Sequence, residues 1–85
     1  DVQDQARLSL ENVKAIVVAA GLSVCYIIKM TVFITDLNDF ATINEVYKQF
    51  FDEHQATYPT RSCVQVARLP KDVKLEIEAI AVRSA

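Results

Sequence analysis

The segment YIIKMTVFIT, at positions 26–35, constrains the fold of this chain more than any other. It is rich in β-branched and aromatic residues, which are typical of β-strands. Side chains alternate between the two faces of a strand. Here one face is half polar, and the other is wholly apolar and consists of Tyr26, Ile28, Met30, Val32 and Ile34. Such a strand is stable only when helices or another sheet cover its apolar face, so we expect helices packed on one side of a β-sheet.

Helical periodicity on both sides of this strand supplies the covering elements. In residues 1–20, apolar side chains recur at spacings of three and four and form a stripe of Val2, Ala6, Leu10, Val13, Val17 and Ala20. Gly21, the single glycine of the chain, follows directly, so we expect it to end the helix with positive φ while Leu22 packs back. After turn and N-cap residues at 36–39, a second helix is predicted with a stripe of Phe40, Ile43, Tyr47, Phe50 and His54.

Two further strands are predicted toward the C-terminus. In residues 60–68, alternation places one group of side chains on a common face: Arg61, Cys63, Gln65 and Ala67. A tight turn is predicted at residues 69–72, and the strand at 73–82 has one apolar face. The resulting order, α-β-α-β-β, indicates an α+β fold with the helices on one face of the sheet. We expect residues 1–85 to form a single domain.

Length and apolar content indicate self-association. A chain of 85 residues buries only roughly 60–65% of the surface that it exposes when unfolded. Nevertheless, 52% of its residues are hydrophobic, and a small monomer has too little interior to bury them all. Three strands also form a narrow sheet for two helices of this length. We therefore expect an oligomer with an incomplete or shared sheet.

Composition argues against several classes of function. The net charge is −2 and no basic run is present, so no nucleic-acid binding is expected. No apolar run approaches the ~18 residues of a membrane-spanning helix, so no membrane association is expected. There is no glycine-rich phosphate loop, and one histidine cannot build a histidine cluster for a metal. The two cysteines indicate free thiols and a cytoplasmic protein.

Cys63 is a candidate nucleophile because it lies two residues from Arg61, whose charge could lower the pKa of the thiol. The alternative is a buried structural cysteine. A nucleophile normally needs a nearby base, and the lone histidine, His54, ends a different element. His54 is itself interpreted as a solvated residue suited to the dipole at a helix C-terminus.

Glu76 and Glu78 share the polar face of the last strand. One interpretation is a solvated edge. The other is that one of them reaches Arg61, which requires the last two strands to pair through the turn between them. An arginine and a carboxylate in one cleft can bind a ligand carboxylate and position a water molecule.

The chain resembles the RidA/YjgF family of 2-iminoacid deaminases in two long segments, TVFITDLNDFATINEVYKQFF at 31–51 and TRSCVQVARLPKDVKLEIEAIAVR at 60–83. The resemblance extends over essentially the whole chain. Its most specific parts are the Arg-Ser-Cys sequence at 61–63 and the Ile-Glu-Ala-Ile-Ala-Val run at 77–82.

This resemblance implies a chorismate-mutase-like α+β fold and a homotrimer with ligand clefts between subunits. It also implies that a β-hairpin and a further strand of the family domain precede the residues present here. Members hydrolyse reactive 2-imino and 2-enamino acids, such as 2-iminobutanoate and 2-iminopropanoate, to 2-oxo acids and ammonia without metal or cofactor.

The same resemblance assigns roles by position. Arg61 matches the arginine that binds the substrate carboxylate, and Cys63 matches the residue whose backbone amide meets the ligand. Glu76 matches the acid that positions water. Phe40 and Asn44 match positions that line the cleft.

Two other functions stay open on the sequence. One is non-catalytic binding or sensing of small 2-oxo or hydroxy acids at the same cleft, for which Arg61 alone suffices. The other is ribonuclease or translation-inhibitor activity, which has been attached to some relatives. The net charge of −2 and the lack of a basic stripe argue against the ribonuclease.

Overall fold

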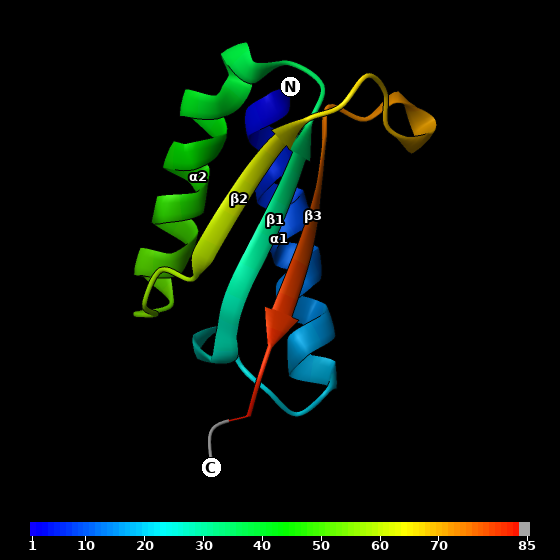
Figure 1. The fold of residues 1–85 in the computed structure, drawn as a ribbon. Helices are drawn as coiled ribbons and strands as arrows, with labels where there is room; N and C mark the ends of the chain where they lie inside the picture. Colours follow the sequence, from blue (N-terminus) through cyan, green and yellow to red (C-terminus); the bar gives the residue numbers. More distant parts are fainter. Residues whose placement is uncertain (84–85) are drawn as a thin grey trace.

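The computed structural model describes residues 1–83. Its main elements are helix α1 (Val2–Ala19), strand β1 (Ile27–Ile34), helix α2 (Phe40–Glu53), strand β2 (Thr60–Gln65) and strand β3 (Leu75–Ala81). This is the predicted order of elements. In Figure 1, α1 lies behind the sheet and α2 lies alongside β2. Both helices pack on the same face of the sheet, because their buried residues share one core with Met30, Val32 and Ile34. The predicted α+β layer is therefore confirmed.

β1 is the central strand of the sheet, whose order is β2-β1-β3. β2 runs parallel to β1 and β3 runs antiparallel to it. Parallel neighbours need a long crossover, usually a helix, and α2 supplies it. The hypothesis that the last two strands pair with each other is therefore wrong, because β1 lies between them.

The connection between β2 and β3 passes over the end of β1. On one side of β1, the N–H of Val66 donates to the carbonyl of Ile34 at 2.8 Å. On the other side, the N–H of Thr35 donates to the carbonyl of Lys74 at 3.1 Å. A short 3₁₀ turn at Pro70–Asp72 reverses the chain between these points, so the predicted turn is present but joins strands that are not neighbours.

The helix-facing side of β1 forms the middle of the core. The residues predicted to face inward over its C-terminal half are buried: Met30, Val32 and Ile34. The predicted faces are wrong where the strand begins, because Ile27 is 4% exposed and Ile28 is 53% exposed. The pairing with β3 shifts register between Ile27 and Lys29. Such an irregularity reverses the alternation of side chains.

The end of α1 has the predicted glycine cap. Gly21 has φ of +81°, a conformation that costs glycine little because it has no Cβ. Its N–H donates to the carbonyl of Val18 at 3.0 Å, and the N–H of Leu22 donates to Val17 at 2.9 Å. These two bonds define a Schellman motif. Leu22 packs against the core, as expected of the hydrophobic partner.

The other face of the sheet has no helix over it within residues 1–83. Large apolar side chains on or beside the strands are exposed to solvent: Ile28, Val64, Ile80 and Val82. In the same part of the chain, β2 and β3 pair with β1 alone, so each has one open edge. No helix of residues 1–83 is long and apolar enough to span a membrane.

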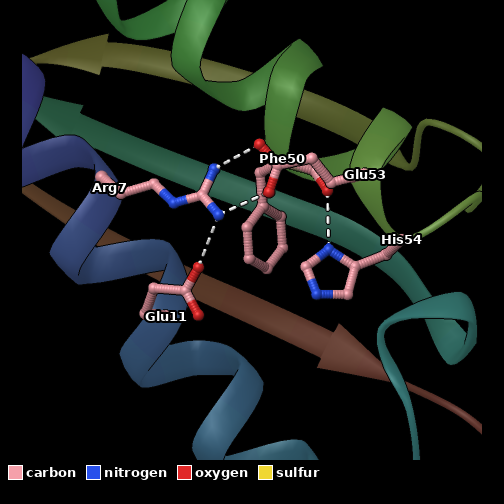
Figure 2. Close-up of polar contacts among 5 residues, drawn as sticks. All are labelled: Arg7, Glu11, Phe50, Glu53 and His54. Carbon is pink, nitrogen blue, oxygen red and sulfur yellow. Dashed lines mark hydrogen bonds and ion pairs between the residues drawn. The ribbon is translucent and has the colours of Figure 1, made fainter.

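A polar cluster, defined here as Arg7, Glu11 and Glu53, joins the two helices (Figure 2). Arg7 of α1 donates two hydrogen bonds to the carboxylate of Glu53 on α2, at 2.6 and 3.1 Å, and contacts Glu11 at 2.9 Å. The guanidinium also lies 5.6 Å from the centroid of the Phe50 ring. His54 is the C-cap residue of α2, and the centroid of its ring lies 4.5 Å from that of the Phe50 ring. The cluster therefore fixes the packing of α1 on α2 above a buried aromatic ring.

Replacing Glu53 by glutamine should make stability less dependent on acid pH. The hydrogen bonds from Arg7 lower the pKa of Glu53 below its ordinary value of 4.5. A carboxylate with a lowered pKa stabilises the fold above its ordinary pKa, and this contribution is lost as pH falls through the lowered value. The stability difference between wild type and Glu53→Gln in urea unfolding should therefore be present at pH 7 and should be lost as the pH falls below 4.5 and through the lowered pKa. Glu45→Gln on the same helix serves as the control, and a difference for Glu53→Gln that is independent of pH would contradict the prediction.

Candidate functional site

Arg61 is the second residue of β2 and pairs with Met30 of β1. Met30 is fully buried under the helices. Paired residues in adjacent strands point to the same side of a sheet, so Arg61 points toward the helices rather than toward the open face. The side chain is half-buried there against α2.

Three residues of α2 surround the guanidinium of Arg61. Its Cζ lies 4.7 Å from the ring centroid of Tyr47 and 5.1 Å from that of Phe40. Arg61 also donates a hydrogen bond to Oδ1 of Asn44. Phe40, Asn44 and Tyr47 follow one another at spacings of four and three, so they lie on one face of the helix. We call this arrangement the Arg61 cage.

The Arg61 cage leaves the charge of the guanidinium uncompensated. Asn44 is a neutral partner, and no carboxylate of residues 1–83 forms an ion pair with Arg61. Aromatic faces attract a cation through their quadrupole, by about 0.5–2 kcal/mol depending on desolvation. The cage therefore holds a cation in place while leaving it available to an incoming anion.

A hollow of about 290 Å³ opens beside Arg61, between α2 and the start of β2. It is lined by Asn44, Tyr47, Lys48, Tyr58, Pro59 and Arg61. This volume is close to the lower end of the range for small-molecule sites, roughly 300–1,000 Å³. In residues 1–83, no group of three or more His, Cys, Asp or Glu side chains could hold a metal ion. The side chains that line the hollow offer two cations, Lys48 and Arg61, together with an amide and two phenolic hydroxyls.

Tyr47 is a buried member of the cage. Its hydroxyl donates a hydrogen bond to the carbonyl of Pro59 at 3.0 Å. Burial raises the pKa of Tyr47, and the nearby Arg61 charge opposes that effect. The phenol therefore stays protonated at neutral pH and remains a hydrogen-bond donor.

Cys63 lies on the same face of β2 as Arg61 and faces the same inner space. It is half-buried and, with Arg61 and Phe40, lines a small apolar cavity of about 10 Å³. Burial raises the pKa of the Cys63 thiol, and the positive charge of Arg61 only opposes this increase. An activated nucleophile requires the opposite shift. The structure therefore favours the structural interpretation of Cys63 over the nucleophilic one.

Glu76 is separated from the Arg61 cage. It pairs with Phe33 of β1, and its neighbours Leu75 and Ile77 are directed to the core, so alternation directs Glu76 to the open face of the sheet. It is exposed there. Within one chain, the structure therefore brings Arg61 together with Phe40, Asn44 and Cys63 but leaves Glu76 on the opposite face.

Four residues that line the hollow were not predicted as site residues from the sequence: Tyr47, Lys48, Tyr58 and Pro59. A signal for Tyr47 was present, because it lies three residues after Asn44 and seven after Phe40 on the same helical face. No comparable signal existed for Tyr58, which lies in the loop before β2. Its hydroxyl donates to Asp52 at 2.7 Å, a contact that depends on how the loop packs.

The fold and the arrangement of this site define the class of protein. The chain belongs to the family described as endoribonuclease L-PSP, whose sequence profile matches residues 1–83. This is the RidA/YjgF family, so the resemblance in the sequence is confirmed.

Particular members of the family are very similar to this chain. TdcF of Escherichia coli (strain K12) is 98% identical over 85 residues, which make up all of this chain and 66% of that protein. A 2-iminobutanoate/2-iminopropanoate deaminase of Salmonella typhimurium is 74% identical over 83 residues, or 98% of this chain and 65% of that protein. The chain thus spans slightly less than two thirds of the length of these relatives.

Solved structures agree with this assignment. The crystal structure of Escherichia coli TdcF with bound serine has a TM-score of 0.98 at 98% identity, and the match covers 99% of this chain and 66% of that one. The YjgF gene product of Escherichia coli has a TM-score of 0.97 at 70% identity, with the same coverage of both chains. The chain therefore has the RidA/YjgF fold over the matched region.

Alkylation of the two cysteines tests the assignment of Cys63. Because Cys25 is exposed, whereas Cys63 is half-buried with a raised pKa, iodoacetamide at pH 7.5 should modify Cys25 first. Peptide mass spectrometry over time measures both rates in one sample. The Cys25→Ser variant should then react slowly throughout. Rapid modification of Cys63 in that variant would restore the nucleophilic interpretation.

Proposed function

We propose that the protein hydrolyses reactive 2-imino and 2-enamino acids, such as 2-iminobutanoate and 2-iminopropanoate, to 2-oxo acids and ammonia. The observation that carries this proposal is the Arg61 cage, a half-buried cation whose hydrogen-bond partner is neutral and which borders a hollow of small-molecule size. Relatives described as 2-iminobutanoate/2-iminopropanoate deaminases support it, since they match this chain at 72–74% identity.

Arg61 binds the carboxylate of the substrate in this proposal. A guanidinium can donate two parallel hydrogen bonds to a carboxylate, which fixes its orientation. A hydrogen bond of this charged kind contributes roughly 1.5–3 kcal/mol. The aromatic rings of Phe40 and Tyr47 restrict where the guanidinium can lie. The backbone N–H of Cys63 is proposed as a further donor to the ligand.

Glu76 positions the attacking water. The water oxygen forms a bond to the imine carbon while Glu76 accepts a proton from it. The imine nitrogen takes up the proton held by Glu76, which gives a carbinolamine. The new hydroxyl group then loses its proton to the nitrogen through Glu76, the carbonyl forms as the carbon–nitrogen bond breaks, and the products are ammonia and a 2-oxo acid. Positioning two reactants in the correct geometry removes much of the entropic barrier, so a general base and an anchored substrate suffice for this hydrolysis. The proposal needs no metal or cofactor.

A complete site then requires more than one copy of the chain. Glu76 lies on the open face of the sheet, whereas Arg61 lies on the helix-facing side. We propose that the protein assembles as a homotrimer in which Arg61 of one subunit and Glu76 of a neighbour face the same cleft. The exposed apolar side chains of the open face support an interface there, because an uncovered apolar surface favours association. A cytoplasmic location is part of the same proposal.

Conservative substitutions at the two proposed catalytic positions test the function. Arg61→Lys keeps the charge but loses the two-pronged geometry, so kcat/KM should fall about 10- to 100-fold. Glu76→Gln should lower kcat by about 100-fold or more because the water loses its base. The assay couples a threonine dehydratase to semicarbazide, and active protein lowers the amount of imine that is trapped.

Glu78→Gln is the matched control, since Glu78 lies two residues along the same exposed face as Glu76. It should retain wild-type activity. Wild-type protein that leaves imine trapping unchanged, or Arg61→Lys with full activity, would contradict the proposal.

The Arg61 cage also favours a second candidate, which is binding or sensing of small 2-oxo or hydroxy acids without turnover. One chain forms the whole cage, whereas Glu76 is remote from it. The structure of TdcF with bound serine shows a small amino acid bound to that relative. Calorimetry with 2-oxobutanoate separates the two functions: binding by wild type and Glu76→Gln alike, with no imine hydrolysis by either, supports sensing.

A further inference from the structure

Tyr47 contacts both the side chain of Arg61 and the backbone that precedes Arg61 in the chain. Its ring lies under the guanidinium, 4.7 Å from Cζ. Its hydroxyl donates to the carbonyl of Pro59, two residues before Arg61, at 3.0 Å. One side chain of α2 therefore contacts both the tip of the Arg61 side chain and the backbone that leads into β2.

Tyr47 is itself held rigidly. It is only 5% exposed, and its ring packs 4.8 Å from that of Phe51, which is fully buried. A tyrosine has few rotatable bonds, whereas an arginine loses up to about 2 kcal/mol of side-chain entropy when it is ordered. A rigid aromatic surface restricts the conformations of the guanidinium before the ligand arrives. Less side-chain entropy is then lost when the ligand binds.

Phe40 and Asn44 each contact only the guanidinium of Arg61. Phe40 contributes a ring at 5.1 Å, and Asn44 contributes one acceptor. In the part of the chain that the structure describes, neither side chain forms a hydrogen bond with the backbone ahead of β2. Tyr47 alone in the Arg61 cage couples the orientation of the guanidinium to the position of its strand.

We propose that Tyr47 is a positioning residue that pre-orients Arg61 for a small carboxylate ligand, the ring restricting the guanidinium and the hydroxyl fixing the start of β2. This inference rests on the proposed function only for the identity of the anion. A purely structural role predicts something different: a core aromatic needs no hydroxyl, and any apolar side chain of similar volume then leaves Arg61 unaffected.

The experiment compares Tyr47→Phe and Tyr47→Leu with Phe50→Leu as the matched control. Phe50 is a fully buried aromatic residue of the same helix, and its ring contacts involve neither Tyr47 nor Arg61. The first readout is the Nε–Hε resonance of Arg61 in ¹⁵N-correlated NMR spectra, assigned by its disappearance in Arg61→Lys. The ring current of Tyr47 shifts this resonance, so it should move toward the position of a solvent-exposed arginine in Tyr47→Leu and move less in Tyr47→Phe. Phe50→Leu lowers the melting temperature but should leave the resonance in place.

The second readout is calorimetric affinity for 2-oxobutanoate. Tyr47→Leu should bind about 10-fold more weakly, in line with a lost cation–π contact. Tyr47→Phe should bind about 3-fold more weakly, in line with one lost hydrogen bond. Phe50→Leu should bind like wild type while it remains folded.

The two readouts fail independently. If wild-type protein binds no 2-oxo acid, the proposed ligand is wrong, while the Arg61 resonance still decides whether Tyr47 orients the side chain. If Tyr47→Leu leaves the resonance and the affinity unchanged, the inference is overturned. Should Tyr47→Leu not fold, Tyr47→Phe decides, and a resonance identical to that of wild type overturns it.

Discussion

The burial of β1 against α2 is the contact on which the rest of the fold depends. One core contains Met30, Val32 and Ile34 of β1 together with Phe50 and Phe51 of α2, and the other two strands are placed on either side of β1. Because the helices cover only one face of β1, each neighbouring strand must present alternate residues to the same side. The parallel register that pairs Arg61 with Met30 then directs a cation into the helix layer. A charge in that position is costly unless it has partners. Phe40, Asn44 and Tyr47 provide them without neutralising it.

The same register separates the two groups that the proposed reaction needs. Glu76 pairs with Phe33 and lies on the opposite side of the sheet from the Arg61 cage. In the proposed reaction, a single copy of this chain would bind the substrate carboxylate at Arg61 but could not also place its own Glu76 against that substrate. The open face and the unpaired strand edges provide surfaces where a second copy, or further residues of a longer chain, could complete the site.

Much of the fold could be predicted from the sequence because its signals are local. Helical and strand periodicity identified five elements in the correct order, and the isolated Gly21 marked the end of α1. The shared face of Arg61 and Cys63 followed from alternation alone. The order of strands did not follow, because nothing in residues 60–82 specifies which edge of β1 each strand joins. The reversed faces of Ile27 and Ile28 depend on pairing with β3 and are equally non-local.

The candidate site was predictable in part for the same reason. The positions of Arg61, Phe40 and Asn44 came from the family resemblance, and their contact depends on the packing of β2 beside α2. Tyr47 was visible only as one apolar residue in a helical stripe. Its hydrogen bond to Pro59 needs the loop before β2 in its folded conformation, which sequence periodicity does not describe.

Co-production of Arg61→Ala and Glu76→Gln chains, each carrying a different affinity tag, tests most directly whether two chains share one site. Each variant alone should be inactive toward the imine. Assemblies purified through both tags should regain activity at about a third of their sites, because each mixed ring of three has one junction at which one chain supplies the guanidinium and its neighbour the carboxylate. Mixed assemblies no more active than either variant alone would contradict a site divided between two copies.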